Sequence, residues 1–185
     1  MSSCRDCLAA LRRAAPVLIL LSALPGCTPG RNQFAPACPE AALLPQAADF
    51  HQYRSQSAGG GHDLTDLVLQ GRVLKVDGRC EPGRNARTLN ATVTVTMEVT
   101  RGPAAPSRTA NVSYFVAVVD GDRILDKRVF TDKVAFPGNI DRVFLVSDPV
   151  AMQLPVTPEK TGAAYTVWAG FQLTPAEMAQ GSAGR

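Results

Sequence analysis

Recognisable catalytic motifs are missing from this chain of 185 residues. It contains no G-x-S-x-G elbow, Walker loop, H-E-x-x-H helix or Rossmann glycine pattern. Histidine is scarce as well, with only His51 and His62. The nearby carboxylates Asp49, Asp63 and Asp66 follow no spacing that a metal site uses. We therefore expect solvated histidines, and neither catalytic residues, a metal nor another cofactor.

A long hydrophobic run is also absent. The apolar segment 14–24 is shorter than a bilayer-spanning helix, which needs about 20 such residues, but it fits the core of an export signal. Leu24-Pro25-Gly26-Cys27 closes the segment, and basic residues precede it. These basic residues are Arg5, Arg12 and Arg13. The arrangement resembles the signal of bacterial lipoproteins, in which a cysteine follows the cleavage site.

The lipoprotein resemblance implies that residues 1–26 are removed and that Cys27 carries a diacylglyceryl group, with palmitate-type chains, on its thiol. Two or three acyl chains, at about 0.8 kcal/mol per buried methylene, hold a protein almost permanently on a membrane. Thr28 stands where lipoproteins of the inner membrane often carry aspartate, so the resemblance favours an outer-membrane lipoprotein facing the periplasm. Pro25 departs from the usual small residue, which leaves open a plain signal peptide with a chance cysteine.

The charge balance gives no indication of a nucleic-acid partner. The chain has a formal net charge of +3, of which +2 belongs to residues 1–26, leaving +1 for the remainder. The basic character is therefore mainly a property of the signal. We expect a membrane partner through the lipid at Cys27, and no nucleic acid.

Two of the five cysteines are expected to form a disulfide. Cys4 and Cys7 lie in the segment to be discarded, and Cys27 takes the lipid. Cys38 and Cys80 remain as an even pair in an oxidising compartment, which favours a bridge between them. Such a bridge closes a loop of roughly 40 residues and contributes about 4 kcal/mol on the chain-entropy model. A catalytic or metal-binding thiol is the alternative, but no histidine lies near either cysteine in the sequence.

Apolar and polar residues alternate with a period of two from residue 63 onward, as in half-buried β-strands. Residues 89–99 show the alternation most clearly, and residues 112–119 are apolar on both faces, as in a central strand. Asp120-Gly121-Asp122 is typical of a β-hairpin turn and leads into a returning strand at 123–130. Further strands are expected at 67–80, at 140–146, at an edge position between Pro149 and Pro158, and at 165–173.

Six or seven short strands with almost no helix predict an all-β fold, a single antiparallel β-sandwich of immunoglobulin-like size. A small barrel is the alternative. The sandwich domain is placed at 38–185, behind a lipidated tether at 27–37, and includes an arm at 39–53 that lies on the domain. Thr174-Pro175-Ala176-Glu177 carries a helix-capping pattern, so a short C-terminal helix is expected there.

Four aromatic residues fall at strand spacing in the predicted sheets. They are Tyr114, Phe115, Trp168 and Phe171. We expect them to pack in the core, with a ligand-binding stripe as the alternative.

Several blocks of the sequence resemble a family of uncharacterised proteobacterial envelope lipoproteins. The blocks are 63–68 (DLTDLV), 101–104 (RGPA), 114–119 (YFVAVV) and 170–174 (GFQLT). The resemblance spans most of the chain after the signal. It implies an envelope location and a compact domain, and it brings no activity and no catalytic residues.

The leading functional hypothesis is a non-enzymatic lipoprotein that serves envelope structure or the assembly of a larger complex, with an envelope protein as its partner. A module that binds a small molecule or a lipid is the first alternative. A concave apolar pocket would favour that alternative, whereas a filled core and a flat apolar edge would favour a protein partner. A cell-wall hydrolase is the third class, and it would need convergent carboxylates or a nucleophile–base pair.

Overall fold

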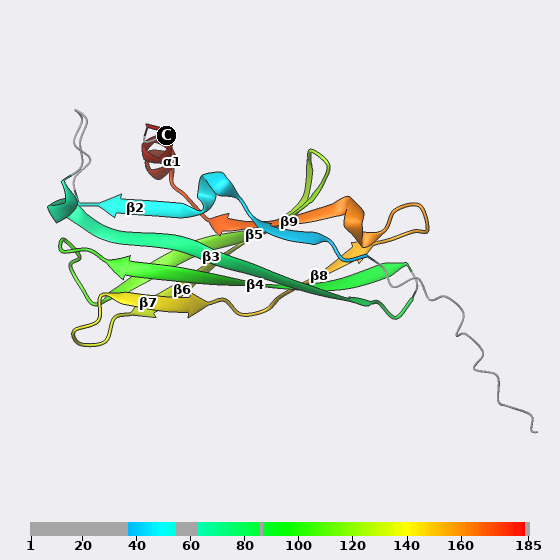
Figure 1. Cartoon of the computed structure of the whole chain (residues 1–185), viewed down its shortest axis with the longest axis horizontal. Coiled ribbons are helices and arrows are strands. Elements are labelled where there is room, and N and C mark those ends of the chain that lie inside the picture. Colours follow the sequence, from blue (N-terminus) through cyan, green and yellow to red (C-terminus); the bar gives the residue numbers. More distant parts are fainter. Residues whose placement is uncertain (1–36, 55–62, 86, 184–185) are drawn as a thin grey trace, which may run out of the picture. The chain divides into compact units, whose positions relative to one another are not determined.

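Two β-sheets make up most of the computed structural model, which describes residues 37–54, 63–85 and 87–183 (Figure 1). One sheet has the strand order β1-β9-β5-β6, and the other has the order β2-β3-β4-β7, with β8 also paired to β4. The strands are β1 (Glu40–Leu43), β2 (Asp49–Tyr53), β3 (Leu67–Pro82), β4 (Thr88–Arg101), β5 (Thr109–Asp120), β6 (Arg123–Ala135), β7 (Arg142–Val146), β8 (Val150–Pro155) and β9 (Tyr165–Phe171). The described strands form two separate sheets and one short helix follows them, so the prediction of an all-β sandwich is confirmed.

Strand β4 shows why the sequence folds into stacked sheets. Its apolar residues point inward and are at most 2 % exposed, while the residues between them are half-buried or exposed. The inward residues are Leu89, Ala91, Val93, Val95, Met97 and Val99. Because successive side chains of a strand point to opposite faces, this period-two pattern buries one face against the other sheet. The strand predicted at 89–99 is thereby confirmed.

The N-terminal arm was expected to lie on the domain, but the structure builds it into both sheets. Strand β1 pairs in parallel with β9, and β2 pairs antiparallel with β3. A 3₁₀ turn at Pro45–Ala47 carries the chain from one sheet to the other. Backbone hydrogen bonds hold the residues on both sides of the turn. Leu44 N donates to Ala169 O (2.8 Å), and Val73 N donates to Ala48 O (2.8 Å). The arm therefore supplies an edge strand to each sheet. The β1–β9 pairing is parallel, whereas the other described strand pairs are antiparallel.

The hairpin predicted at Asp120-Gly121-Asp122 is confirmed. Strands β5 and β6 pair antiparallel along their length, from Asp120 opposite Arg123 to Thr109 opposite Ala135. Gly121 adopts a φ of 58°, which glycine reaches without the steric penalty that a side chain would add. The hairpin places β6 at an open edge of its sheet.

The C-terminal helix α1 (Pro175–Ala183) begins where the capping pattern predicted it. Thr174 N donates a hydrogen bond to Glu177 Oε2 (2.7 Å), and Glu177 N donates to Thr174 Oγ1 (3.3 Å). This reciprocal pair satisfies two backbone donors that a helix start would otherwise leave unpaired.

Three of the four aromatic residues singled out in the sequence are buried as expected. Tyr114 and Phe171 lie between the sheets, and Phe115 packs in a second cluster with Ala47 and Ala117. Trp168 is only half-buried. Core packing therefore accounts for Tyr114, Phe115 and Phe171.

Candidate functional site

Cys38 and Cys80 are joined by a disulfide, with their Cα atoms 5.7 Å apart. Cys80 lies on β3 opposite Ala91 of β4, and Cys38 stands just before β1. The bridge therefore links the start of the N-terminal arm, just before β1 of one sheet, to β3 of the other sheet. The predicted lipidation site Cys27 and the signal at 1–26 lie outside the described residues, as does all of the tether except Ala37.

The histidines mark no site in the described part of the chain. His51 is exposed on β2, and His62 falls outside the described residues. Within residues 37–54, 63–85 and 87–183, no three histidine, cysteine, aspartate or glutamate side chains lie close enough to share a metal ion. No described helix is long and apolar enough to cross a membrane.

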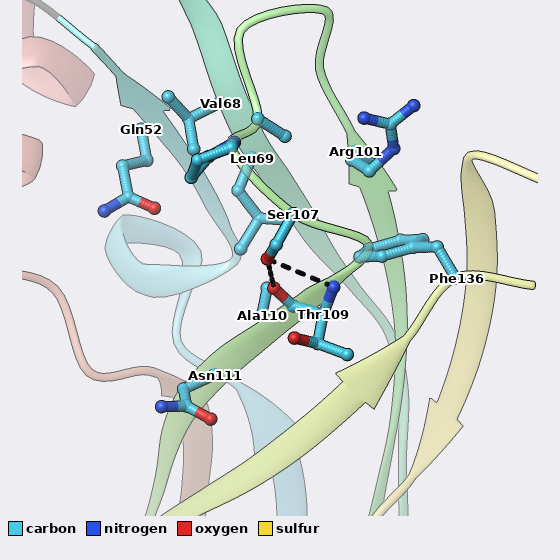
Figure 2. A pocket seen from close by; sticks show the side chains of 11 residues that line it. Gln52, Val68, Leu69, Arg101, Ser107, Thr109, Ala110, Asn111 and Phe136 are labelled. Atoms are coloured by element: carbon cyan, nitrogen blue, oxygen red, sulfur yellow. Dashed lines mark hydrogen bonds between the residues drawn. The ribbon is translucent and has the colours of Figure 1, made fainter.

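A hollow of about 310 Å³ opens between β2 and β3 of one sheet and the start of β5 in the other (Figure 2). Its lining is partly apolar, from residues such as Leu69 and Phe136, and partly polar. Figure 2 shows Ser107 engaged with Thr109, whose backbone N donates to Ser107 Oγ (3.3 Å) while that hydroxyl donates to Thr109 O (2.7 Å). The hollow is therefore shaped partly by a locally bonded loop.

The polar groups of the hollow offer little chemistry. Its one charged lining residue, Arg101, donates to Asp141 Oδ1 (2.9 Å) and is 20 % exposed. The amides of Gln52 and Asn111 also line the hollow and are exposed, beside the hydroxyl residues Ser107 and Thr109. Neutral amides can orient a ligand by hydrogen bonds, but they supply neither a nucleophile nor a general base.

A buried polar cluster lies where β5 and β6 approach the connection between β7 and β8. Tyr114 is 1 % exposed, stacks on Phe130 with ring centroids 5.4 Å apart, and lies close to Asp132 and Ser147. Ser147 is 4 % exposed, accepts a hydrogen bond from Val95 N (2.9 Å), and thereby fills the break between β7 and β8 in the pairing with β4. Burial, followed by the negative charge of Asp132, raises the pKa of Tyr114 to about 12.

The shifted pKa of Tyr114 makes the fold sensitive to alkali. An unfolded tyrosine ionises near pH 10, whereas the folded Tyr114 has a pKa of about 12. The contribution of protonated Tyr114 to the free energy of unfolding is therefore fully present below pH 10. It is lost as the pH rises from about 10 to about 12. We expect Tyr114→Phe to flatten this part of the curve of urea midpoint against pH. Equal slopes for the two proteins between pH 10 and 12 would show that Tyr114 does not contribute.

A second cluster of shifted groups lies at the hairpin end of β5. The Lys160 ammonium pairs with the Asp120 carboxylate and stands 4.8 Å over the ring centroid of Tyr165. The direct hydrogen bond lowers the pKa of Asp120 and raises the pKa of Lys160. Tyr165 in turn donates its hydroxyl proton to Pro155 O (2.6 Å). These groups bind one another and fix the connection between β8 and β9 to the hairpin.

Strand β7 presents an exposed apolar edge. Phe144 is 67 % exposed, Val146 is 62 % exposed, and Ile140 just before the strand is 47 % exposed. The strand pairs with β4 on one side, and no described strand pairs with its other side. Large exposed apolar side chains beside unpaired backbone groups are a template on which another strand can dock.

Three of the other strand edges carry features that discourage docking. Strand β6 is rich in charged side chains, which are interspersed with the exposed apolar residues Ile124, Leu125 and Val129. Strand β8 is bounded by Pro149 and Pro155, and β1 has only four residues. The charged residues of β6 are Arg123, Asp126, Lys127, Arg128, Asp132 and Lys133. Edge charges, prolines and short strands are the usual protections against edge-to-edge association. Strand β7 has one charged residue, Arg142, and no proline; β2, at the opposite end of the same sheet, likewise has one charged residue, Asp49.

No family model, curated protein or solved structure matches this chain in the comparisons with known proteins. Function must therefore be argued from the surfaces themselves.

Proposed function

We propose that this protein is a non-enzymatic lipoprotein of the cell envelope, held in the outer membrane by acyl chains on Cys27 and facing the periplasm. Its β-sandwich binds another envelope protein along the open edge of β7 and so serves the assembly of a complex. The exposed apolar side chains of Phe144 and Val146 on that edge carry the proposal.

The interior supports a protein partner over a small ligand. The space between the sheets is filled by a continuous cluster of buried side chains, from Phe50 and Leu89 to Phe171. The hollow beside Gln52 and Asn111 opens at the surface, and its walls mix apolar and polar side chains with one arginine, Arg101. A filled core with an apolar edge fits recognition by strand addition, in which main-chain hydrogen bonds supply affinity and alternate side chains supply specificity.

The broad outer face of the same sheet is a poor docking surface. Asp49, Arg72 and Glu98 stand in one row across β2, β3 and β4, and the row ends at Phe144 of β7, where its charges give way to an apolar side chain. Arg72 Nε donates to Asp49 Oδ1 (2.8 Å), and both side chains remain about half exposed or more. A partner covering this row would have to desolvate paired charges, which costs more than extending the sheet at its edge.

The anchor is tested by replacing Cys27 with serine. We expect the native protein to incorporate radiolabelled palmitate and the Cys27→Ser variant to incorporate none, because serine lacks the thiol that forms the thioether. The Cys38→Ser variant is the matched control and should still be labelled. Labelling of the Cys27→Ser variant, or none of the native protein, would contradict the lipoprotein assignment.

The partner is tested by placing a photo-reactive phenylalanine analogue at position 144 in the full-length protein in cells. We expect a discrete crosslinked adduct after irradiation. The same analogue in place of Val129, which is 51 % exposed on the charged edge β6, is the control and should give none. Absence of an adduct at position 144 would overturn the proposed docking edge.

A further inference from the structure

We propose that the strand docked on β7 is β7 of a second copy of this chain, paired antiparallel about a two-fold axis at Leu145. The inference rests on the proposed use of β7 as a docking edge and adds the identity and register of the partner. In this register Arg142 lies opposite Asp148 of the second copy, and Phe144 lies opposite its Val146.

The backbone of β7 is set up for this pairing. Arg101 N donates to Asp141 O (2.7 Å), and Ser147 N donates to Val95 O (2.9 Å), both in the register that pairs β7 with β4. Residues of an antiparallel pair alternate between bonding inward to their partner and pointing their N–H and C=O groups away from it. Residues 141 and 147 bond inward, so Arg142, Phe144 and Val146 direct their backbone groups to the open edge.

The side chains of this edge are self-complementary. From Arg142 to Asp148 the exposed alternate residues read positive, apolar, apolar, negative. Arg142 also forms an ion pair with Glu98 of its own chain (Nε to Oε1, 3.6 Å), so in the dimer its guanidinium lies between two carboxylates. Two copies running antiparallel about Leu145 place each arginine opposite an aspartate and each phenylalanine opposite a valine. Opposite charges and apolar pairs stabilise directly opposed positions of a sheet, whereas like charges destabilise them.

Neighbouring registers lack this match. A two-fold axis at Phe144 would place Arg142 opposite Val146 and leave each guanidinium facing an apolar side chain. An axis at Val143 would bring Phe144 opposite Arg142 and would leave Asp148 outside the paired region. The Leu145 register is the one that pairs both charges of the edge with an opposite charge.

Two-fold symmetry and a membrane anchor suit such a short strand. A pairing of two identical strands is isologous and closes as a dimer, so it leaves the edge covered and builds no fibre. A five-residue strand buries less area than a standard protein interface, and such an interface is weak in dilute solution. Anchoring both copies to one membrane raises their effective concentration and compensates for the short contact.

A charge-swap series on the full-length, membrane-anchored protein tests the register. Arg142→Asp puts aspartate opposite aspartate at two symmetric positions, and Asp148→Arg puts arginine opposite arginine. We expect either single variant to lower the yield of chemically crosslinked dimer in membranes on the order of tenfold. The double variant Arg142→Asp/Asp148→Arg restores opposite charges at both positions and should restore the dimer. Asp148 is exposed and Asp148→Arg should retain the native urea midpoint, whereas Arg142→Asp also loses the surface ion pair with Glu98 and should lower the midpoint slightly.

The outcomes separate this inference from the proposed function. Loss in both single variants with rescue in the double variant supports the second copy, because exchanging two charges of one chain cannot repair contacts with a different protein. A monomeric native protein whose photo-adduct at position 144 contains another polypeptide overturns the second copy and leaves the proposed function standing. A dimer unaffected by the single variants overturns the register. No adduct at position 144 overturns both proposals.

Discussion

Replacing Cys38 and Cys80 together with serine should lower the free energy of unfolding by about 4 kcal/mol. The two cysteines are 42 positions apart in the sequence, and the chain between them includes β1, β2 and most of β3. Cross-linking a loop of this length restricts the unfolded chain far more than the folded one. Without the bridge, the four-residue strand β1 would be tied to β9 only by its own pairing and by the following turn.

Urea unfolding monitored by Trp168 fluorescence measures the effect of the bridge. The native protein in the presence of dithiothreitol should unfold at the same urea concentration as the double serine variant, because both lack the same covalent constraint. The variant should show no further response to dithiothreitol. A double variant that unfolds within about 1 kcal/mol of the oxidised native protein would show that the bridge adds little to the fold.

The long strands were predictable because their pattern is local. In β4, a strand of 14 residues, the alternation continues from Leu89 to Val99, and only a strand with one buried face accounts for it. The Asp-Gly turn between β5 and β6 and the capping pattern at Thr174 are equally local, and both were confirmed. Each of these signals depends on residues within a few positions of one another.

The N-terminal strands were missed for the opposite reason. Strands β1 and β2 have four and five residues, too few to show a period, and Pro45 separates them. Their strand conformation is imposed by pairing with β9 and β3, which lie far along the chain. Tertiary pairing of this kind has no signature in the arm itself.

The candidate docking edge was only half visible in the sequence. Residues 140–146 were predicted as a strand, but Val143 and Leu145 are as apolar as Phe144 and Val146. Alternation therefore could not show which pair faces water. Phe144 is exposed because it lies opposite Glu98 on the outer face of the sheet, whereas Val143 and Leu145 lie opposite the buried Val99 and Met97; this register is set by the pairing of β7 with β4. The polar cluster of Tyr114, Asp132 and Ser147 was hidden in the same way, because its members come from three segments.

Replacing Phe171 with alanine should lower the free energy of unfolding by about 3–5 kcal/mol. Its side chain is 1 % exposed and meets the ring of Phe50 edge-on, with centroids 4.7 Å apart. Phe171 ends β9 in one sheet and Phe50 lies on β2 in the other, so their contact holds the two sheets together where the arm crosses. Gly71 of β3 leaves the space that both rings fill, since a Cβ there would come within 2.9 Å of Phe171 Cζ.

The cost of Phe171→Ala combines lost burial with the cavity that remains. The neighbours of Phe171 belong to two sheets that pack face to face and cannot collapse into the space, so the free-energy cost of the cavity should be large. Phe144→Ala is the matched control, because it removes the same atoms from a ring that is 67 % exposed and should change the stability of the monomer by less than about 0.5 kcal/mol. Urea midpoints of both variants give the comparison directly. A loss below about 1.5 kcal/mol for Phe171→Ala would mean that the Phe50–Phe171 contact does not hold the sheets together.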